Sequence, residues 1–329
     1  MERIIIAVHG LGNKPIKMLL KRWWQKSISE GLERIGRGRL MLPIEMVYWA
    51  DILYEKSLKP WITDKGNASY IEEPYRKSKE ISRMKPKSWR TSFYKYIEQQ
   101  LDKIFLNEDM SLNYSRVSDT IIHRYFKDLD IYFSEAPCRI DNHRSARDCI
   151  HERLKSVLNT HKNKKILLIG HSMGSIIAYD VLAHASDYLK VHTFVTIGSP
   201  LGLPVVAGKI FSRRKSEAKG AGPLRTPENI THHWYNISDI EDRVALDHTL
   251  ADDYLSNSQG IQAVDLDVYN DYRNNGNRNP HKSYGYLRTP EMAGIIDAFL
   301  QDERKNYGNM MYRYLKKYLS FARKHLSKK

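Results

Sequence analysis

The 329-residue sequence has few cysteines and no long apolar segment. Its two cysteines, Cys138 and Cys149, are too few for a disulfide scaffold and do not have zinc-site spacing, so we expect two ordinary thiols. No run approaches the roughly 18 to 20 apolar residues that a membrane-spanning helix needs. The apolar run at 4–8 is too short for a signal peptide and leads into a glycine loop. These absences predict a protein of the cytoplasm.

Cofactor motifs are also missing. The glycine loop at 10–12 follows an apolar run, as a dinucleotide-binding loop would, but Pro15 stands where the third glycine belongs. No P-loop is present. The adjacent His232 and His233 would point to opposite faces of a strand and would not share one metal ion, and no other ligand set has suitable spacing. We therefore expect neither a cofactor nor a metal.

The sequence does have an ordinary globular balance and a strong positive charge. Hydrophobic residues make up 41% and charged residues 28%, which allows a sizeable core. The net charge of +15 would attract phosphates, whether on nucleic acid or on anionic lipid headgroups. The basic residues are scattered and join no known nucleic-acid-reading motif, so specific nucleic-acid binding is not expected.

Strand and helix patterns alternate along most of the chain. Strands are expected at 3–8, 43–49, 165–169, 191–197, 232–237 and 261–268, helices at about 16–35, 144–161, 175–185 and from 290, and a basic, glycine-rich loop at about 208–228. This alternation predicts a mostly parallel central sheet with helices on both faces.

Two segments depart from this alternation. Residues 51–140 are polar and rich in aromatics and lysines, and they separate two strand–helix units, so we expect a largely helical cap or lid inserted into a core formed by 1–50 and 141–302. In the basic segment 303–329, apolar residues recur at helical spacing. We expect an amphipathic helix there, which either packs on the domain or makes peripheral contact with an anionic membrane.

The run Gly-His-Ser-Met-Gly at 170–174 carries the main chemical signal. It follows a short apolar strand and opens an apolar helix, the setting of a nucleophile elbow. The glycines are needed because the turn is sharp and leaves no room for side chains beside it. The turn would lift a hydroxyl out at the carboxyl edge of the sheet, where the helix N-terminus favours developing negative charge. Ser172 is the expected nucleophile.

Together with His-Gly-Leu-Gly at 9–12, this run resembles the lipase/esterase branch of the α/β-hydrolase superfamily. The resemblance covers about 1–50 and 144–300, but neither the insertion nor the tail. It implies an α/β-hydrolase fold and acyl transfer through an acyl-enzyme on Ser172. It also implies an oxyanion hole made by the backbone amides of Leu11 and Met173.

In this superfamily the acid and then the histidine follow the nucleophile along the chain. The run Asp-Arg-Val-Ala that begins at Asp242 is similar to the lipase Asp-Pro-Val-Ala pattern, with an arginine in place of the proline. Asp239, on the same loop, is the rival acid. His281 lies in an Asn- and Pro-rich loop after the last expected strand, and His248 is the alternative base. The predicted triad is Ser172, Asp242 and His281.

The expected function is hydrolysis of carboxylic esters. Lipid or phospholipid esters are favoured because the expected cap mixes aromatic with basic residues. A small ester or thioester, or an acyl acceptor other than water, would use the same triad. The alternative that is not an enzyme is a catalytically silent module of this fold, which binds anionic lipid or nucleic acid. The filled triad positions, in the expected order, favour the enzyme.

Overall fold

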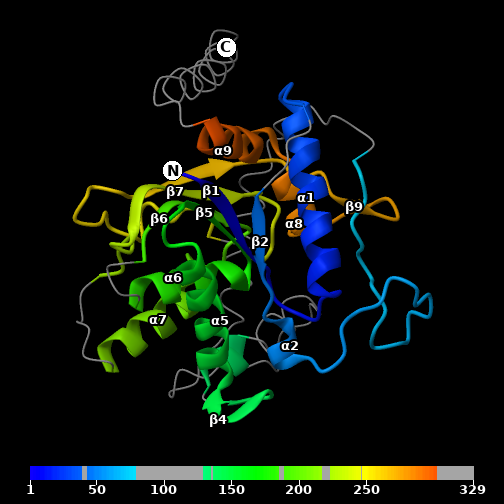
Figure 1. Ribbon diagram of the computed structural model, residues 1–329, viewed down its shortest axis with the longest axis horizontal. Helices are drawn as coiled ribbons and strands as arrows, with labels where there is room; N and C mark the ends of the chain where they lie inside the picture. Colours follow the sequence, from blue (N-terminus) through cyan, green and yellow to red (C-terminus); the bar gives the residue numbers. More distant parts are fainter. Residues whose placement is uncertain are drawn as a thin grey trace, which may run out of the picture.

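A computed structural model describes residues 1–38, 43–78, 129–134, 136–184, 189–216, 223–245 and 247–301 (Figure 1). Most of the predicted cap and the whole of the predicted helix at 303–329 lie outside the described residues. Within the described part, no helix is long and apolar enough to cross a membrane.

A six-stranded parallel sheet forms the centre of the molecule. Its strands, in spatial order, are β2 (Ile44–Val47), β1 (Arg3–Val8), β5 (Lys165–His171), β6 (Val191–Ile197), β7 (Ile230–Ser238) and β8 (Ala263–Asp267), and every neighbouring pair is parallel. The central strands are runs of aliphatic residues because both faces of a parallel sheet are covered. The predicted parallel sheet is confirmed.

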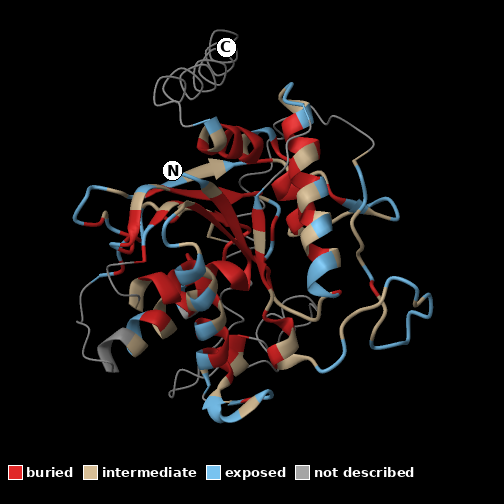
Figure 2. Ribbon diagram, in the orientation of Figure 1, coloured by how far each residue is buried: buried red, intermediate tan, exposed pale blue. Residues whose placement is uncertain are grey.

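Helices cover both faces of this sheet (Figure 1). One face carries α1 (Lys17–Arg34), α8 (Ser283–Leu287) and α9 (Pro290–Gln301), and the other carries α2 (Ala50–Leu53), α5 (Ala146–Thr160), α6 (Met173–His184) and α7 (Pro204–Ser216). Side chains alternate along β1, so Ile4 and Ile6 enter one core cluster while Ile5 and Ala7 enter the other. Figure 2 shows the result, with buried strands between helices whose outer sides are exposed.

The expected loop at 208–228 is wrong in its first part, because α7 runs through it as far as Ser216. Pro204 suits the first position of a helix, since its missing N–H would have no partner there. Val206 and Ile210 lie one turn apart and are buried, so the segment has an apolar stripe. Arg213 lies in the last turn, where the helix dipole favours cations.

Two small hairpins were not expected. The first joins β9 (Arg273–Asn274) to β10 (Asn277–Arg278) through Asn275 and Gly276, with φ of 51° and 83°. An Asn-Gly pair with both φ positive is the favoured turn of a two-residue hairpin, so the sequence held this signal. The second hairpin pairs β3 (Pro137–Cys138) with β4 (Asp141–Ser145).

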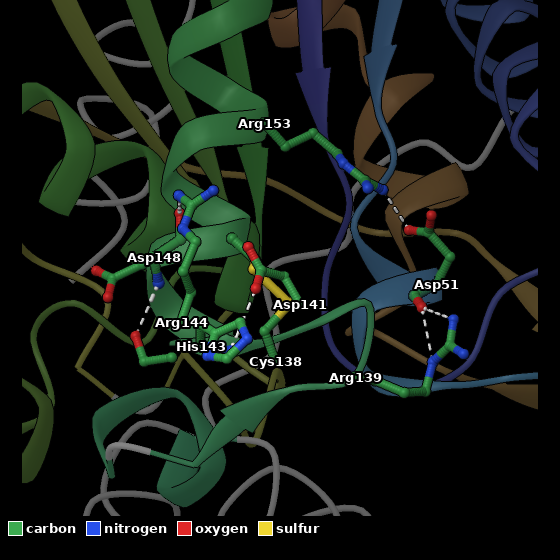
Figure 3. Close-up of a disulfide and its surroundings, with 10 residues drawn as sticks. Asp51, Cys138, Arg139, Asp141, His143, Arg144, Asp148 and Arg153 are labelled. Carbon is green, nitrogen blue, oxygen red and sulfur yellow. Dashed lines mark hydrogen bonds and ion pairs between the residues drawn. A yellow bond between two sulfur atoms is a disulfide. The ribbon is translucent and has the colours of Figure 1, made fainter.

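The interpretation of the cysteines as ordinary thiols is wrong. Cys138 on β3 and Cys149 on α5 form a disulfide, and both residues are buried (Figure 3). The pairing arises because the hairpin returns the chain and α5 then brings Cys149 back beside Cys138, which spacing alone does not reveal. Disulfides are rare in cytosolic proteins, and the cytoplasmic location stays a prediction.

The two ends of the segment 51–140 lie side by side. Asp51 lies in α2, and its carbonyl accepts hydrogen bonds from the Arg139 guanidinium, which comes just after β3. Figure 3 shows the Asp51 carboxylate paired with Arg153 of α5 at the same place. The chain therefore leaves the sheet region and returns to it at one position beside α5.

Candidate active site

Ser172 occupies a strained turn between the central strand β5 and helix α6. Its φ of 53° lies in the left-handed region, which residues other than glycine rarely adopt. Backbone strain of this kind is concentrated at functional sites. Its side chain was expected to stand exposed at the sheet edge, and that expectation is wrong, since Ser172 is 0% exposed. The imidazole of His281 lies against its Oγ, and the loop containing Gly10 lies against its Cβ.

His281 connects this serine to a buried carboxylate. Its Nε2 lies 3.0 Å from Ser172 Oγ, while its Nδ1 lies 2.9 Å and 3.0 Å from the two carboxylate oxygens of Asp242. A carboxylate accepts hydrogen bonds only, so Nδ1 carries the proton and Nε2 is left to accept the serine hydroxyl proton. The structure therefore brings the three residues of the predicted triad together, in the tautomer that a general base requires.

Asp242 is fully buried on the loop after β7. Its Oδ2 accepts a 2.6 Å hydrogen bond from the Tyr286 hydroxyl, and its Oδ1 accepts a 2.9 Å bond from the Val244 amide. Burial alone would raise the pKa of Asp242, but the neighbouring His281 and these hydrogen bonds outweigh burial and lower it. The carboxylate is therefore ionised at neutral pH. Sequence reasoning missed Tyr286, because nothing in the sequence marks it as a partner of this loop.

The rival acid, Asp239, has different partners. Its Oδ2 pairs with Arg278 and accepts a 2.6 Å hydrogen bond from the Asn270 amide. Burial raises the pKa of Asp239, and the charge of Arg278 opposes this only in part. Asp239 thus joins the loop after β7 to the loop that carries His281, and the imidazole contacts Asp242 instead.

The alternative base, His248, makes a different contact. Its carbonyl accepts a hydrogen bond from the Asn236 side chain on β7. The histidine that contacts Ser172 is His281, which the position in chain order had favoured over His248.

The loop at 9–12 lies directly beside the serine turn, as the predicted oxyanion hole requires. A Cβ on Gly10 would lie 2.9 Å from Ser172 Cβ, and a Cβ on Gly174 would lie 2.4 Å from the carbonyl oxygen of Val8. Only glycine permits such approaches. In the described part of the chain, neither the Leu11 nor the Met173 amide donates a hydrogen bond, so both donors have capacity for another acceptor.

Two buried histidines hold this arrangement. His9 donates from Nδ1 to the Gly10 carbonyl at 2.8 Å, and its Nε2 accepts from the Trp49 amide at 3.1 Å. His171 Nε2 donates to the His281 carbonyl at 2.8 Å. Burial holds the pKa of both His9 and His171 well below the usual value. They are neutral at pH 7 and act through hydrogen bonds.

The parallel sheet between two helical layers, with a serine turn after a central strand and an acid and a histidine further along the chain, defines an α/β-hydrolase fold. The predicted fold class is confirmed. Residues 129–217 match the PGAP1-like alpha/beta domain, an α/β-hydrolase-type lipase/esterase family, and this range includes the serine turn. A comparison with curated proteins gave no match. Within the residues that the structure describes, no cluster of three or more His, Cys, Asp or Glu side chains could hold a metal ion.

Proposed function

We propose that this protein is a serine esterase that cleaves carboxylic esters, preferably of lipids, through an acyl-enzyme on Ser172. The observation that carries the proposal is the relay from Ser172 Oγ through His281 to Asp242, with contacts of 3.0 and 2.9 Å. The family match of residues 129–217 supports a hydrolase of the lipase/esterase type.

In the proposed first step, His281 Nε2 takes the proton of Ser172 Oγ as the oxygen attacks the ester carbonyl. The negative charge that develops on the carbonyl oxygen is stabilised by the amides of Leu11 and Met173. The imidazolium is stabilised by Asp242 and then gives its proton to the leaving alcohol. Water, activated by the same imidazole, hydrolyses the acyl-enzyme. An acceptor alcohol or thiol in place of water would give acyl transfer.

The buried position of Ser172 adds a requirement to this mechanism. Because the side chain is 0% exposed, a substrate reaches it only after covering residues have moved. Opening and closing of covering segments is a common step in enzymes that exclude water from the reacting groups. We therefore expect slow acylation by small soluble esters unless something favours the open arrangement.

Exposed apolar side chains near the glycine loop favour a lipid substrate. A bridge between Pro15 and Leu58, with Leu58 N donating to the Lys14 carbonyl at 2.9 Å, joins two segments beside this loop. These segments carry three of the exposed large apolar side chains, Ile16 at 55%, Met18 at 70% and Trp61 at 71% exposure. Lys59 Nζ lies 5.9 Å from the ring of Trp61. Aromatic, aliphatic and cationic side chains together suit the surface of an anionic bilayer. Peripheral membrane contact by 303–329 remains a separate prediction.

A fluorophosphonate probe and an ester series test the proposal together. We expect the probe to label the wild-type protein at Ser172 and not to label Ser172→Ala, with hydrolysis of p-nitrophenyl esters lost in the same variant. Longer acyl chains and phospholipids in vesicles should be cleaved faster than short soluble esters. Absence of labelling and turnover in the folded wild type would instead favour the silent binding module.

A further inference from the structure

The loop that carries His281 is held by a side chain from a distant part of the sequence. Glu73 lies in the described part of the segment that leads towards 79–128. Its carboxylate accepts hydrogen bonds of 2.8 and 2.9 Å from the Asn279 side chain and forms a 3.1 Å ion pair with Lys282. Asn279 and Lys282 flank His281 on either side, so Glu73 holds both ends of this short stretch.

Asn279 passes this contact directly to the histidine. While its Nδ2 donates to Glu73, its Oδ1 accepts the backbone N–H of His281 at 3.0 Å. The Asn279 amide group is thus fixed in one orientation by Glu73, because a carboxylate accepts only from the NH2 side. A fixed Asn279 in turn fixes the backbone from which the imidazole projects. The path from Glu73 to the proposed base contains one side chain and two hydrogen bonds.

Glu73 is charged and partly buried in this contact. Burial alone would raise the pKa of Glu73, but the charge of Lys282 and the hydrogen bonds from Asn279 and Lys282 outweigh burial and lower it. The ionised carboxylate therefore persists at neutral pH. Charge-assisted hydrogen bonds are short and directional, which suits a group that fixes geometry.

The segment around Glu73 is fastened to the histidine loop at further points. The carbonyls of Glu72 and Pro74 accept hydrogen bonds from Asn274 and from the Tyr272 hydroxyl, at 2.9 and 2.7 Å. Figure 1 shows this segment crossing beside β9, far from it in sequence. The core also supports the loop, since the Asn270 side chain donates to the carbonyls of Pro280 and Lys282. Both the core and the start of the insertion therefore hold the histidine loop.

We propose that Glu73 is a positioning residue for His281, so that the segment leading into 79–128 determines how well the base is aligned with Ser172. The inference rests on the proposed esterase function. It adds that the segment outside the sheet region is coupled to the reacting groups through a specific carboxylate, Glu73. Movement of this segment would loosen Asn279 and Lys282 together and withdraw the imidazole from the serine.

The test compares Glu73 variants with an exposed glutamate of the same segment. Glu73→Ala removes both contacts, and because a misplacement near 1 Å can cost about a hundredfold, we expect kcat to fall about tenfold to a hundredfold with KM within about twofold. Glu73→Gln keeps an oxygen for Asn279 but not the charge for Lys282, so it should restore part of kcat. Glu55→Ala, at an exposed position, should match the wild type. The rate of fluorophosphonate labelling of Ser172 should fall in parallel with kcat.

A double-mutant cycle separates positioning from general stability. Asn279→Ala breaks the same path, so the Glu73→Ala/Asn279→Ala double variant should be no slower than the slower single variant. A Glu73→Ala protein with wild-type kcat and labelling rate but a lower melting temperature would overturn the proposal. If that variant does not fold, wild-type kcat in both Glu73→Gln and Asn279→Ala overturns it. A folded wild type with no labelling at Ser172 refutes the esterase function itself, and the coupling with it.

Discussion

Replacing Asp242 by Asn tests the electrostatic part of the proposed mechanism with little change in shape. The carboxylate is fully buried and contacts the imidazole at 2.9 Å. At this distance, and with an effective dielectric constant of about 20, a carboxylate and an imidazolium attract each other by about 6 kcal/mol. The imidazolium exists only once the serine proton has been transferred, so this attraction stabilises the transition state more than the ground state.

The amide of Asn also disturbs the hydrogen bonds. Asp242 accepts from His281, Tyr286 and the Val244 amide, and an Asn side chain has only one oxygen for these donors. Its NH2 group would face a donor in either orientation, or would force the imidazole into the other tautomer, with the proton on Nε2. Since 1.36 kcal/mol corresponds to tenfold in rate, the lost attraction predicts a fall in kcat of about 10⁴-fold.

The rate of ester hydrolysis and the rate of fluorophosphonate labelling would both measure this loss. Circular dichroism would show that the fold is kept. The matched control is Asp239→Asn, which removes a charge from the same loop but at the ion pair with Arg278. We expect this control to lower the melting temperature and to keep kcat within about tenfold, because Asp239 does not contact the imidazole. Near wild-type kcat in Asp242→Asn, or loss of activity only in Asp239→Asn, would refute the assignment of the acid.

Three further predictions concern the surroundings of the site. Gly198→Ala should lower kcat about a hundredfold, because its Cβ would lie 2.9 Å from the acid and 3.2 Å from Nδ1 of the base at a φ of 53°; wild-type kcat would contradict this. The disulfide between Cys138 and Cys149 closes a short loop, so Cys138→Ala/Cys149→Ala should lower the free energy of unfolding by about 3 kcal/mol. Thiol titration of the protein denatured without reductant should find neither cysteine, and two reactive thiols would count against the bridge. Burial alone would raise the pKa of Asp180, but hydrogen bonds from two histidines and the charge of Arg147 hold it well below its usual value. The stability from this carboxylate is therefore present above about pH 4 and lost as the pH falls through the folded-state value. Asp180→Asn should lower the free energy of unfolding at pH 7 by about 3 to 5 kcal/mol, with a smaller effect near pH 3, and equal urea midpoints at pH 7 would exclude the role.

The sequence alone was sufficient for the features that depend on local pattern. Runs of aliphatic residues predicted the strands, because a parallel sheet buries both faces of each strand. The glycines around Ser172 and after the first strand predicted close backbone approaches, since no other residue fits there. The resemblance to the lipase Asp-Pro-Val-Ala pattern then selected Asp242 from several acids, and chain order selected His281 from several histidines. The structure brings these two to Ser172.

Contacts between distant segments were decided only by the tertiary structure. Tyr286 donates a hydrogen bond to Asp242, and Arg278 forms an ion pair with Asp239. Glu73 binds the loop of His281 although some 200 residues separate them in sequence. The disulfide and the burial of Ser172 were likewise decided only by the tertiary structure. Local sequence determines which backbone conformation a segment prefers, whereas which side chains meet depends on how the elements pack, and that is set by the whole core together.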